Sequence, residues 1–275
     1  MDRYAFAGGT AIVTGAASGI GEALAGALAA RGSHLVLLDR DAERLGAVAD
    51  TIRAAHAALT VDTVVVDLAD HEATVKAGQR LAADHPGTTL LVNNAGVALG
   101  GRFDQITLDE FDWLMEINFR AVVTLTHCLL PVLRTHPGAH LANVSSVFGI
   151  IAPAGQPAYS ASKFAVRGFT EALRAELAGE GVGVTCVHPG GIATRIASSA
   201  RIGSGVSQEE IAEGRAQIGR LLSIPPATAA EAILRGVERR SPRVLIGWSA
   251  RIPDLIARLA PGSYTRILTL AMSRR

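Results

Sequence analysis

Short apolar runs rich in β-branched residues recur along the whole chain, separated by longer stretches in which apolar residues return every three or four positions. Runs of this length, bounded by polar or glycine residues, are typical of strands that are buried on both faces. The runs that meet this description are 10–14, 34–39, 63–66, 90–93, 140–144, 183–187 and 244–246. The pattern therefore predicts seven buried strands.

The stretches between these runs have the spacing of amphipathic helices. In the last of them, Thr228 and Glu231 are spaced as a capping box that follows Pro225 and Pro226. The predicted helices are 21–30, 42–56, 72–84, 108–134, 158–178 and 228–239.

Strand and helix alternate from one end of the chain to the other, and no linker, repeat or low-complexity tract interrupts them. Such alternation indicates βαβ units, whose right-handed crossovers place helices on both faces of a parallel sheet. We therefore expect an α/β protein, with a single doubly wound Rossmann domain over residues 1–275 and about seven parallel strands.

Two segments stand outside this alternation. Residues 194–223 begin rich in Ser and Gly and continue rich in Glu and Arg, and their length favours a substrate lid over an ordinary loop. Residues 248–275 form an amphipathic C-terminal extension. Its apolar helical face comprises Ile252, Leu255, Ile256 and Leu259.

This extension is also basic, because residues 240–275 contain seven Arg and one Asp. Two interpretations are open. The segment is a terminal helix that packs on the body of the protein or on a second subunit, or it is a basic amphipathic element that contacts a membrane surface.

Composition places the 275-residue chain among globular proteins, since 49% of its residues are hydrophobic and 19% are charged. The net charge of +1 argues against nucleic acid as a partner. We expect a cytoplasmic location, because the chain shows neither a secretory leader pattern nor an uncharged apolar stretch of about 18 residues. Cys128 and Cys186 lack ligand spacing and the histidines are scattered, so no metal site is expected.

A glycine-rich turn follows the first predicted strand and precedes the first predicted helix. Glycines permit a tight turn and a close approach of the backbone to phosphate, and the helix N-terminus offers unpaired N–H groups and a favourable dipole. The turn is therefore a candidate pyrophosphate site, although its G-x-x-x-G-x-G spacing differs from the common G-x-G-x-x-G. Its candidate residues are Gly15, Ser18, Gly19, Ile20 and Gly21.

Asp39 ends the second predicted strand, 20 residues after Gly19. A carboxylate at this position accepts hydrogen bonds from the adenosine ribose and repels a 2′-phosphate, which favours NAD over NADP. The adjacent Arg40 could instead stack on adenine or meet a 2′-phosphate, so NADP stays open. Asp67 and Leu68 follow the third predicted strand, where a side chain could reach the adenine edge.

Tyr159 and Lys163 are four residues apart in a predicted helix and therefore share one face. Lysine is rare in this chain, because 24 of the 26 basic residues are Arg. An ammonium group near a phenol lowers the phenol's pKa from about 10 and makes it an acid/base group. Ser146 lies just past the 140–144 strand and could hold a substrate oxygen, and Ser145 is the competing choice.

These motifs resemble those of the short-chain dehydrogenase/reductases, in the single-domain NAD(P)-dependent branch with a Y-x-x-x-K active site. The resemblance covers about residues 8–247 and implies hydride transfer between nicotinamide and a secondary alcohol or ketone. The matching pieces are T-G-x-x-x-G-I-G at 14–21, D-L at 67–68, N-N-A-G at 93–96, Asn118 in M-E-I-N, S-S at 145–146, Y-S-A-S-K at 159–163 and P-G-G-I-A-T at 189–194.

The resemblance implies a catalytic tetrad. Tyr159 would be the acid/base and Ser146 would orient the substrate oxygen. Lys163 would bind the nicotinamide ribose and lower the pKa of the tyrosine, and Asn118 would hold a water that relays protons through Lys163. Asn93 looks like a clamp between neighbouring strands.

The same resemblance implies further cofactor contacts, an apolar substrate and a homodimer or homotetramer built on the 108–134 and 158–178 helices. The apolar residues that could form a wall for the substrate are Phe148, Ile150 and Ile151. The further cofactor residues are Asn94, Ala95, Gly96, Pro189, Gly190, Ile192 and Thr194, with Asn94, Ile192 and Thr194 at the nicotinamide end.

Overall fold

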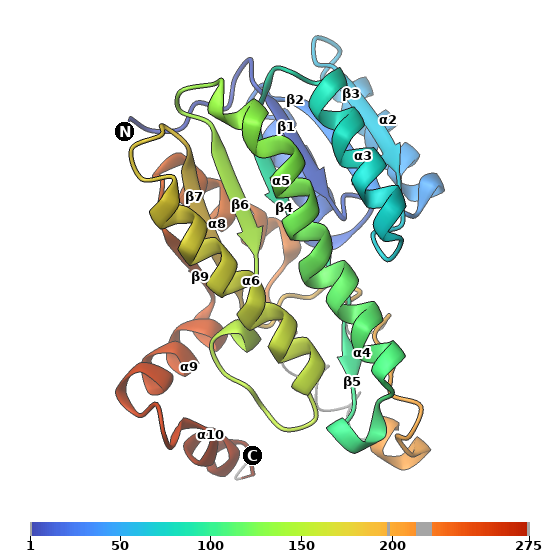
Figure 1. The fold of residues 1–275 in the computed structure, drawn as a ribbon, viewed down its shortest axis with the longest axis vertical. Helices are drawn as coiled ribbons and strands as arrows, with labels where there is room; N and C mark the ends of the chain where they lie inside the picture. Colours follow the sequence, from blue (N-terminus) through green and yellow to red (C-terminus); the bar gives the residue numbers. More distant parts are fainter. Residues whose placement is uncertain (1, 197–198, 213–221, 274–275) are drawn as a thin grey trace.

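The computed structural model describes residues 2–196, 199–212 and 222–273, and its centre is a seven-stranded parallel sheet with helices on both faces (Figure 1). The predicted α/β Rossmann class is confirmed. In spatial order the strands are β3 (Val61–Val65), β2 (His34–Asp39), β1 (Thr10–Thr14), β4 (Thr88–Asn93), β6 (His140–Val144), β7 (Gly183–Pro189) and β9 (Arg243–Ile246).

The order of the strands reverses between β1 and β4. The strands β1, β2 and β3 build toward one edge, whereas β4, β6, β7 and β9 build toward the other. Open α/β sheets bind their ligands in the crevice outside the carboxyl ends of the strands at such a reversal. Thr14 and Asn93, the last residues of β1 and β4, mark this point.

Adjacent residues of β1 point to opposite faces of the sheet, so that Val13 and Ile12 belong to separate apolar cores. The helices that cover the Val13 face are α1 (Gly19–Ala29), α2 (Ala42–Ala55) and α8 (Pro226–Glu238). Those that cover the Ile12 face are α3 (His71–Asp84), α5 (Ala121–Arg134) and α6 (Pro157–Glu176).

The predicted 108–134 helix is continuous but contains a wider turn. α4 (Leu108–Met115) runs through a π-helical turn, η2 (Glu116–Arg120), into α5. By length and composition alone, this is the one helix among the described residues that could cross a membrane. In this fold it packs on the sheet and buries Leu125 and Leu129 in the core.

α8 begins earlier than predicted. Pro225 is its N-cap and Pro226 its first residue, so Thr228 lies inside the first turn and does not cap it. Proline suits this position, because the first N–H groups of a helix have no partner in the helix. Glu231 does not close a capping box but pairs with Arg31, which follows α1, at 2.8 Å.

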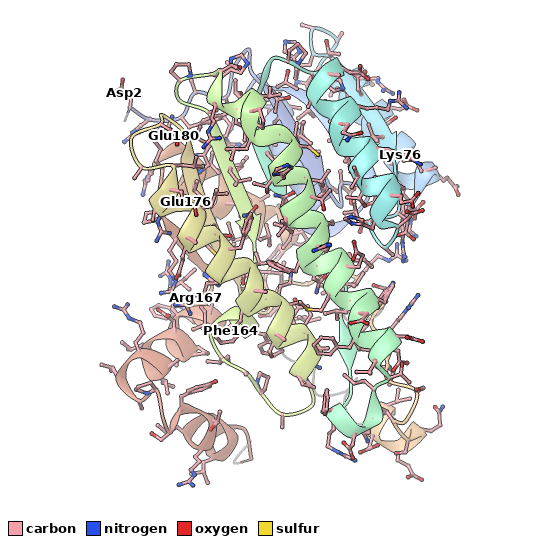
Figure 2. The ribbon with its side chains drawn as sticks, viewed as in Figure 1. Asp2, Lys76, Phe164, Arg167, Glu176 and Glu180 are labelled. Atoms are coloured by element: carbon pink, nitrogen blue, oxygen red, sulfur yellow. The ribbon has the colours of Figure 1, made fainter. Side chains whose placement is uncertain are left out.

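The two lysines lie in opposite environments. Lys76 points outward from α3 beside the exposed Glu72, at 3.8 Å (Figure 2). Lys163 lies on α6 and is 3% exposed. Burial of a lysine is unusual unless a partner or a function requires it.

The C-terminal extension forms α9 (Trp248–Leu259) and α10 (Tyr264–Ser273). The buried residues of α9 are Ala250 and Asp254, whereas most of the predicted apolar face is exposed to solvent. The helix thus packs on the body of the protein with its Ala250 and Asp254 side, and a second subunit and a membrane surface both stay open as partners of its apolar face.

Candidate active site

The glycine turn lies at the reversal point, between β1 and α1. Gly15 and Gly19 have φ angles of +68° and +60°, which favour glycine. A Cβ on Gly21 would lie 2.0 Å from the carbonyl oxygen of Gly15, so only glycine lets the helix start this close to the turn. Ser18, the N-cap of α1, makes no side-chain capping bond and leaves the N–H groups of the first turn to a ligand.

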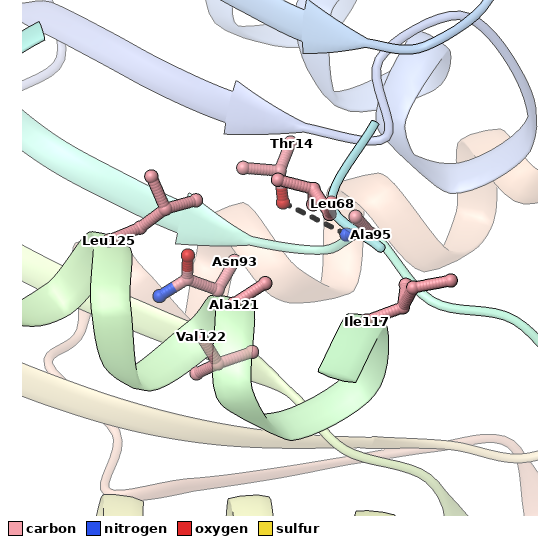
Figure 3. Close-up of a pocket in the computed structure, with 8 residues that line it drawn as sticks. All are labelled: Thr14, Leu68, Asn93, Ala95, Ile117, Ala121, Val122 and Leu125. Carbon is pink, nitrogen blue, oxygen red and sulfur yellow. Dashed lines mark hydrogen bonds between the residues drawn. The ribbon is translucent and has the colours of Figure 1, made fainter. Parts of the chain in front are cut away.

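Thr14 links this turn to the end of β4 by hydrogen bonds. Its Oγ1 accepts a hydrogen bond from the N–H of Asn94, at 3.0 Å. It accepts a second from the N–H of Ala95, at 2.9 Å (Figure 3). The Asn94 side chain donates to the carbonyl oxygens of Thr14 and Gly15. The cavity whose lining residues are drawn in Figure 3 has no room for a water molecule. The side chains around it are therefore closely packed and support the turn.

Asn93 clamps neighbouring elements together, as predicted. Its Nδ2 donates to Oδ1 of Asn143 on β6, at 2.8 Å, and to Oγ1 of Thr126 on α5, at 3.1 Å. The clamp keeps β4 and β6 in register where the site residues follow them.

The carboxylate of Asp39 lies against the glycine turn. Oδ2 accepts a hydrogen bond from the N–H of Ala17, and Oδ1 accepts one from the N–H of Asp41. A carboxylate has about four acceptor positions, so two remain for a ligand hydroxyl. The geometry fits a contact with the adenosine ribose.

Arg40 points to Asp67, with Nη1 of Arg40 3.9 Å from Oδ2 of Asp67 and both side chains about half exposed. Asp67 also accepts a hydrogen bond from the N–H of Ala69 in its own turn. Leu68 is buried in the core beneath, so only its backbone could meet a ligand.

Tyr159 and Lys163 share one face of α6, as their spacing predicts. Nζ of Lys163 lies 5.8 Å from the centre of the Tyr159 ring and donates to the carbonyl oxygen of Val144, at 3.2 Å. The lysine therefore joins α6 to the end of β6 beneath the tyrosine.

The two adjacent serines are distinguished by their partners. Ser145 Oγ donates to the main-chain carbonyl oxygen of Lys163, at 2.8 Å. The side chain of Ser146 interacts with the hydroxyl of Tyr159 and acts to lower its pKa, and it accepts a hydrogen bond from the N–H of Phe148, at 3.1 Å. Of the two candidates, Ser146 is the one that faces the tyrosine.

The pKa of Tyr159 differs from the expectation that the nearby Lys163 lowers it. Burial raises the pKa of Tyr159, and its interaction with Ser146 opposes this only in part. Burial also lowers the pKa of Lys163 from 10.5 to about 8. In this state the phenol is neutral and can donate a proton.

Asn118 lies in the π-helical turn η2, and such turns often occur at functional sites. Its side chain binds Val97 twice, accepting from N–H at 2.8 Å and donating to the carbonyl oxygen at 3.0 Å. A Cβ on Gly96 would lie 3.1 Å from Nζ of Lys163 and 3.3 Å from Oδ1 of Asn118. Glycine therefore lets Asn118 and Lys163 approach the same backbone.

The segment that follows β7 packs against the glycine turn through Thr194. Pro189 ends the strand, and a Cβ on Gly190 would lie 2.1 Å from Oγ of Ser249. Ile192 is buried. The side chain of Thr194 lies beside Gly19, where a Cβ on the glycine would be 3.1 Å from the threonine methyl group.

Comparisons with known proteins agree with this geometry. Residues 9–204 match the short chain dehydrogenase family. The chain is 40% identical over 273 residues to SadH of Mycobacterium tuberculosis H37Rv, which covers 98% of this chain and 97% of SadH. The chain belongs to the short-chain dehydrogenase/reductase family. It is an NAD(P)-dependent oxidoreductase.

Solved members of the short-chain dehydrogenase/reductase family have the same fold. The enzyme of Burkholderia phymatum in complex with NAD is 26% identical, covers 93% of this chain and 95% of its own, and has a TM-score of 0.83. The Sphingobium yanoikuyae enzyme in complex with NADPH is 27% identical, covers 96% and 95%, and has a TM-score of 0.77. These relatives bind different dinucleotides, so the choice between the two depends on this chain's own residues.

The site of this short-chain dehydrogenase/reductase fits a dinucleotide. The uncapped start of α1, the space that Gly21 leaves and the acceptors of Asp39 match a pyrophosphate next to a ribose. Within the described ranges, no three His, Cys, Asp or Glu residues are grouped to hold a metal ion.

The sequence did not predict a role for three supporting residues. Thr14 holds the glycine turn, and Ser162 links Asn118 to the backbone of Tyr159. His188 is fully buried, and its Nδ1 lies 3.0 Å from the carbonyl oxygen of Ser146. A carbonyl oxygen only accepts hydrogen bonds, so Nδ1 carries the proton. Its place next to Pro189 was the one signal for this residue.

The predicted lid at 194–223 lies partly outside the described residues, which lack 197–198 and 213–221. β8 (Arg201–Ile202) pairs with β5 (Leu99–Gly100). The guanidinium of Arg201 lies 3.7 Å from the centre of the Trp113 ring, and Glu210 pairs with Arg102 at 2.8 Å. The described part is thus attached to the β5–α4 region.

Proposed function

We propose that this enzyme reduces ketones to secondary alcohols, or oxidises such alcohols, with Tyr159 as the proton-transferring group. The observation that carries the proposal is the contact between Ser146 and Tyr159 above a buried Lys163, at the carboxyl end of β6. A neutral phenol with a serine hydroxyl beside it can hold a carbonyl oxygen by two hydrogen bonds. These bonds strengthen as negative charge develops on that oxygen.

The dinucleotide, when bound, supplies or accepts a hydride at C4 of its nicotinamide ring. The start of α1 and Gly15 would hold its pyrophosphate, and Asp39 its adenosine ribose. Thr194 and Ile192 would lie at the nicotinamide end. Asn94 would act on the dinucleotide indirectly, because its side chain is hydrogen-bonded to the glycine turn.

Tyr159 would donate its proton to the carbonyl oxygen of a ketone as the carbonyl carbon becomes C–H. The raised pKa of this tyrosine supports that direction, since the phenol keeps its proton at neutral pH. Lys163, with a pKa of about 8, is mostly an ammonium at pH 7 and can bind ribose hydroxyls and return a proton to the tyrosine. Asn118 would hold the relay water through its backbone, because its side chain binds Val97.

NAD is the proposed cofactor. Asp39 places a negative charge where NADP would carry its 2′-phosphate, and like charges at such a distance disfavour binding. Arg40 offers little compensation, because it lies near Asp67.

An apolar ketone or alcohol fits the surroundings of Tyr159 best. The ring of Phe148 packs edge to face against Tyr159, at 6.0 Å between ring centres. Leu99 and Leu114 are buried in the apolar cluster that Tyr159 joins, and Ile150 and Ile151 are buried nearby in sequence. The predicted homodimer or homotetramer through the 108–134 helix and α6 remains part of the proposal.

The deciding experiment is a panel of apolar and polar ketones and secondary alcohols, followed at the nicotinamide absorbance with NAD(H) and NADP(H) in parallel. We expect turnover of apolar members, with NAD(H) preferred. Tight binding of NADH without turnover of any member would instead indicate a nucleotide-binding regulator on the same fold.

A further inference from the structure

An exposed apolar strip runs along the outer side of α9. Trp248, Ile252, Leu255 and Leu259 are spaced by four, three and four residues and therefore lie on one helical face. Their exposed fractions are 73%, 53%, 57% and 77%. We call these four residues the α9 strip. Large apolar side chains grouped in this way mark an interaction surface.

Positive charge borders the α9 strip. Arg251 and Arg258 lie on α9 itself, and the guanidinium of Arg251 is 5.7 Å from the centre of the Trp248 ring. Arg266 continues the charge on α10. Each of these arginines has a long stem that can lie along apolar surface while its head group stays in water.

The acidic residue of this region is paired mainly with a partly buried arginine, and its contact with the exposed Arg258 is longer, at 4.0 Å. Asp254 is the only acid in residues 240–275. It is buried, and Arg243 of β9 holds both of its oxygens, at 2.5 and 3.3 Å. The face that α9 presents to solvent is therefore apolar and cationic.

We propose that the α9 strip docks on an anionic phospholipid surface, with its apolar side chains among the upper acyl chains and its arginines at the phosphates. A helix with Trp and Leu on one face, bordered by arginines, has the composition of an interfacial membrane helix. Each such basic residue adds attraction to anionic lipid.

A second copy of the chain fits the α9 strip less well. In a twofold symmetric contact the same patch meets itself, so the arginines that border the strip in one copy would approach the cationic patch of the other copy. Asp254 is the acid of the extension, and it is buried between Arg243 and Arg258 of its own chain, so it is not presented to a second copy. An anionic surface satisfies the charge and the apolar strip together.

The docking surface is connected to the site. Figure 1 shows α9 and α10 beyond the end of β6 at which the arrow of the strand points, on the side of α6. The hydroxyl of Tyr264, at the start of α10, accepts a hydrogen bond from the N–H of Ala152, at 3.2 Å. Ala152 lies in the loop that leads from Ser146 to α6. Docking would thus hold this loop near the bilayer.

Flotation with lipid vesicles tests the proposal without any measurement of turnover. The full-length protein is mixed with vesicles of phosphatidylcholine alone, or of equimolar phosphatidylcholine and phosphatidylglycerol, at low and high salt. We expect flotation with the anionic vesicles, weakened by salt, and little with the neutral ones. In a Trp113→Phe variant, Trp248 is the remaining tryptophan, and its emission should shift to the blue on binding.

Matched variants identify the surface. Leu255→Ser with Leu259→Ser should lower the partition coefficient by about tenfold or more per residue. Arg251→Gln with Arg258→Gln should lower it by roughly fivefold per charge. The controls remove equally exposed groups elsewhere, namely Phe103→Ser with Leu108→Ser, and Arg80→Gln, and should bind as the wild type does.

Three results would overturn the proposal. The first is no flotation of the wild type, and the second is equal flotation of the strip variants and the controls. The third is an oligomer of the wild type that the strip variants dissociate, measured by light scattering, without vesicle binding. That outcome would assign the α9 strip to a second copy.

Discussion

Ser145 and Lys163 are joined by a hydrogen bond, in which the serine hydroxyl donates to the main-chain carbonyl oxygen of the lysine, at 2.8 Å. The bond ties the end of β6 to α6 inside the protein. The next residue, Ser146, has an extended backbone and turns its side chain to Tyr159. The two adjacent serines therefore have separate contacts, which match a structural role for Ser145 and the role at the reacting oxygen that we propose for Ser146.

Single substitutions of Ser145 and Ser146 test the two roles separately. Ser146→Ala removes a hydrogen bond to the substrate oxygen and should lower kcat by about 10²-fold, with little change in thermal stability. Ser145→Ala removes the buried hydrogen bond between β6 and α6 and should cost about 1 kcal/mol of unfolding free energy, with a smaller loss of rate. Unfolding curves and steady-state kinetics on both variants check this. A well-folded Ser145→Ala enzyme that is the less active of the two would reverse the assignment.

Tyr159→Phe removes the proposed proton donor and leaves the ring in place. We expect turnover to fall by about 10³-fold or more, because no other group stands ready to protonate the oxygen. Binding of NADH, measured by its fluorescence, should stay near the wild-type value. Tyr4→Phe is the matched control, since Tyr4 donates or accepts a 2.8 Å hydrogen bond with Thr89 in the core and should affect stability alone. Retained turnover in Tyr159→Phe would show that another group carries the proton.

Most strands could be predicted because both of their faces are buried. β6 and β7 are buried throughout, and most of their residues are apolar. β3 lies at the edge of the sheet with Asp62 and Thr63 exposed, so its polar start was missed and its limits shifted by up to two residues. The outward face of α9 could not be predicted, because periodicity shows that a face is apolar and not what covers it.

The proximity of the candidate catalytic residues Tyr159 and Lys163 could be predicted because their spacing is local. Tyr159 and Lys163 meet across one turn of a helix. The supporting contacts are not local, since Thr14 and Asn94 are 80 residues apart. Burial was also not visible in the sequence, and it moves the pKa of Tyr159 upward where the charge of Lys163 alone predicts a decrease. The burial of Tyr159 in the fold thus determines that its phenol starts in the protonated form.

The pKa of Lys163 predicts a pH dependence of stability. Its folded value of about 8 lies below the usual 10.5, so between these pH values the unfolded chain binds more protons than the folded one. The unfolding free energy should therefore rise with pH across this window, by about 3 kcal/mol for a shift of roughly 2.5 pH units. Urea unfolding of the cofactor-free wild type and Lys163→Met at pH 7–10.5 measures the difference.

The second lysine provides the control for this experiment. Lys76→Met removes an exposed side chain, so the wild type and this variant should keep a constant difference over the same pH range. A constant difference for Lys163→Met as well would contradict the buried, depressed lysine. In addition, Lys163→Arg should lose activity, because a planar guanidinium does not replace a compact ammonium at a ribose.

Asp39→Ala should weaken the preference for NAD. The substitution removes the charge that repels a 2′-phosphate and an acceptor for the ribose, so the ratio of kcat/KM for NAD to that for NADP should fall by about tenfold or more. Asp41→Ala is the control. It removes the N-cap of α2, whose side chain accepts from the N–H of Arg44, and should leave the ratio unchanged. If the ratio responds to Arg40→Ala and not to Asp39→Ala, the arginine selects the cofactor.

His188 forms a hydrogen bond with the carbonyl oxygen of Ser146, and we expect this bond to position Ser146. His188→Leu removes the donor and should lower kcat by roughly tenfold, with the KM for the cofactor unchanged. His188→Asn offers an amide N–H in place of Nδ1 and should restore most of the rate. Equal losses in both variants would argue for packing in place of the hydrogen bond.

The pH profile gives an independent test of the same residue. Burial lowers the pKa of His188 to about 4, so the ring is neutral through pH 5–8 and its protonation should add no inflection near pH 6.5 to kcat. Its folded pKa lies below the unfolded 6.5, so its contribution to stability should be complete above pH 6.5 and should decrease as the pH falls toward 4. Rates and urea unfolding of the wild type and His188→Asn between pH 4 and 8 measure both effects. An inflection near pH 6.5 that His188→Asn removes would show that this histidine titrates in the native enzyme.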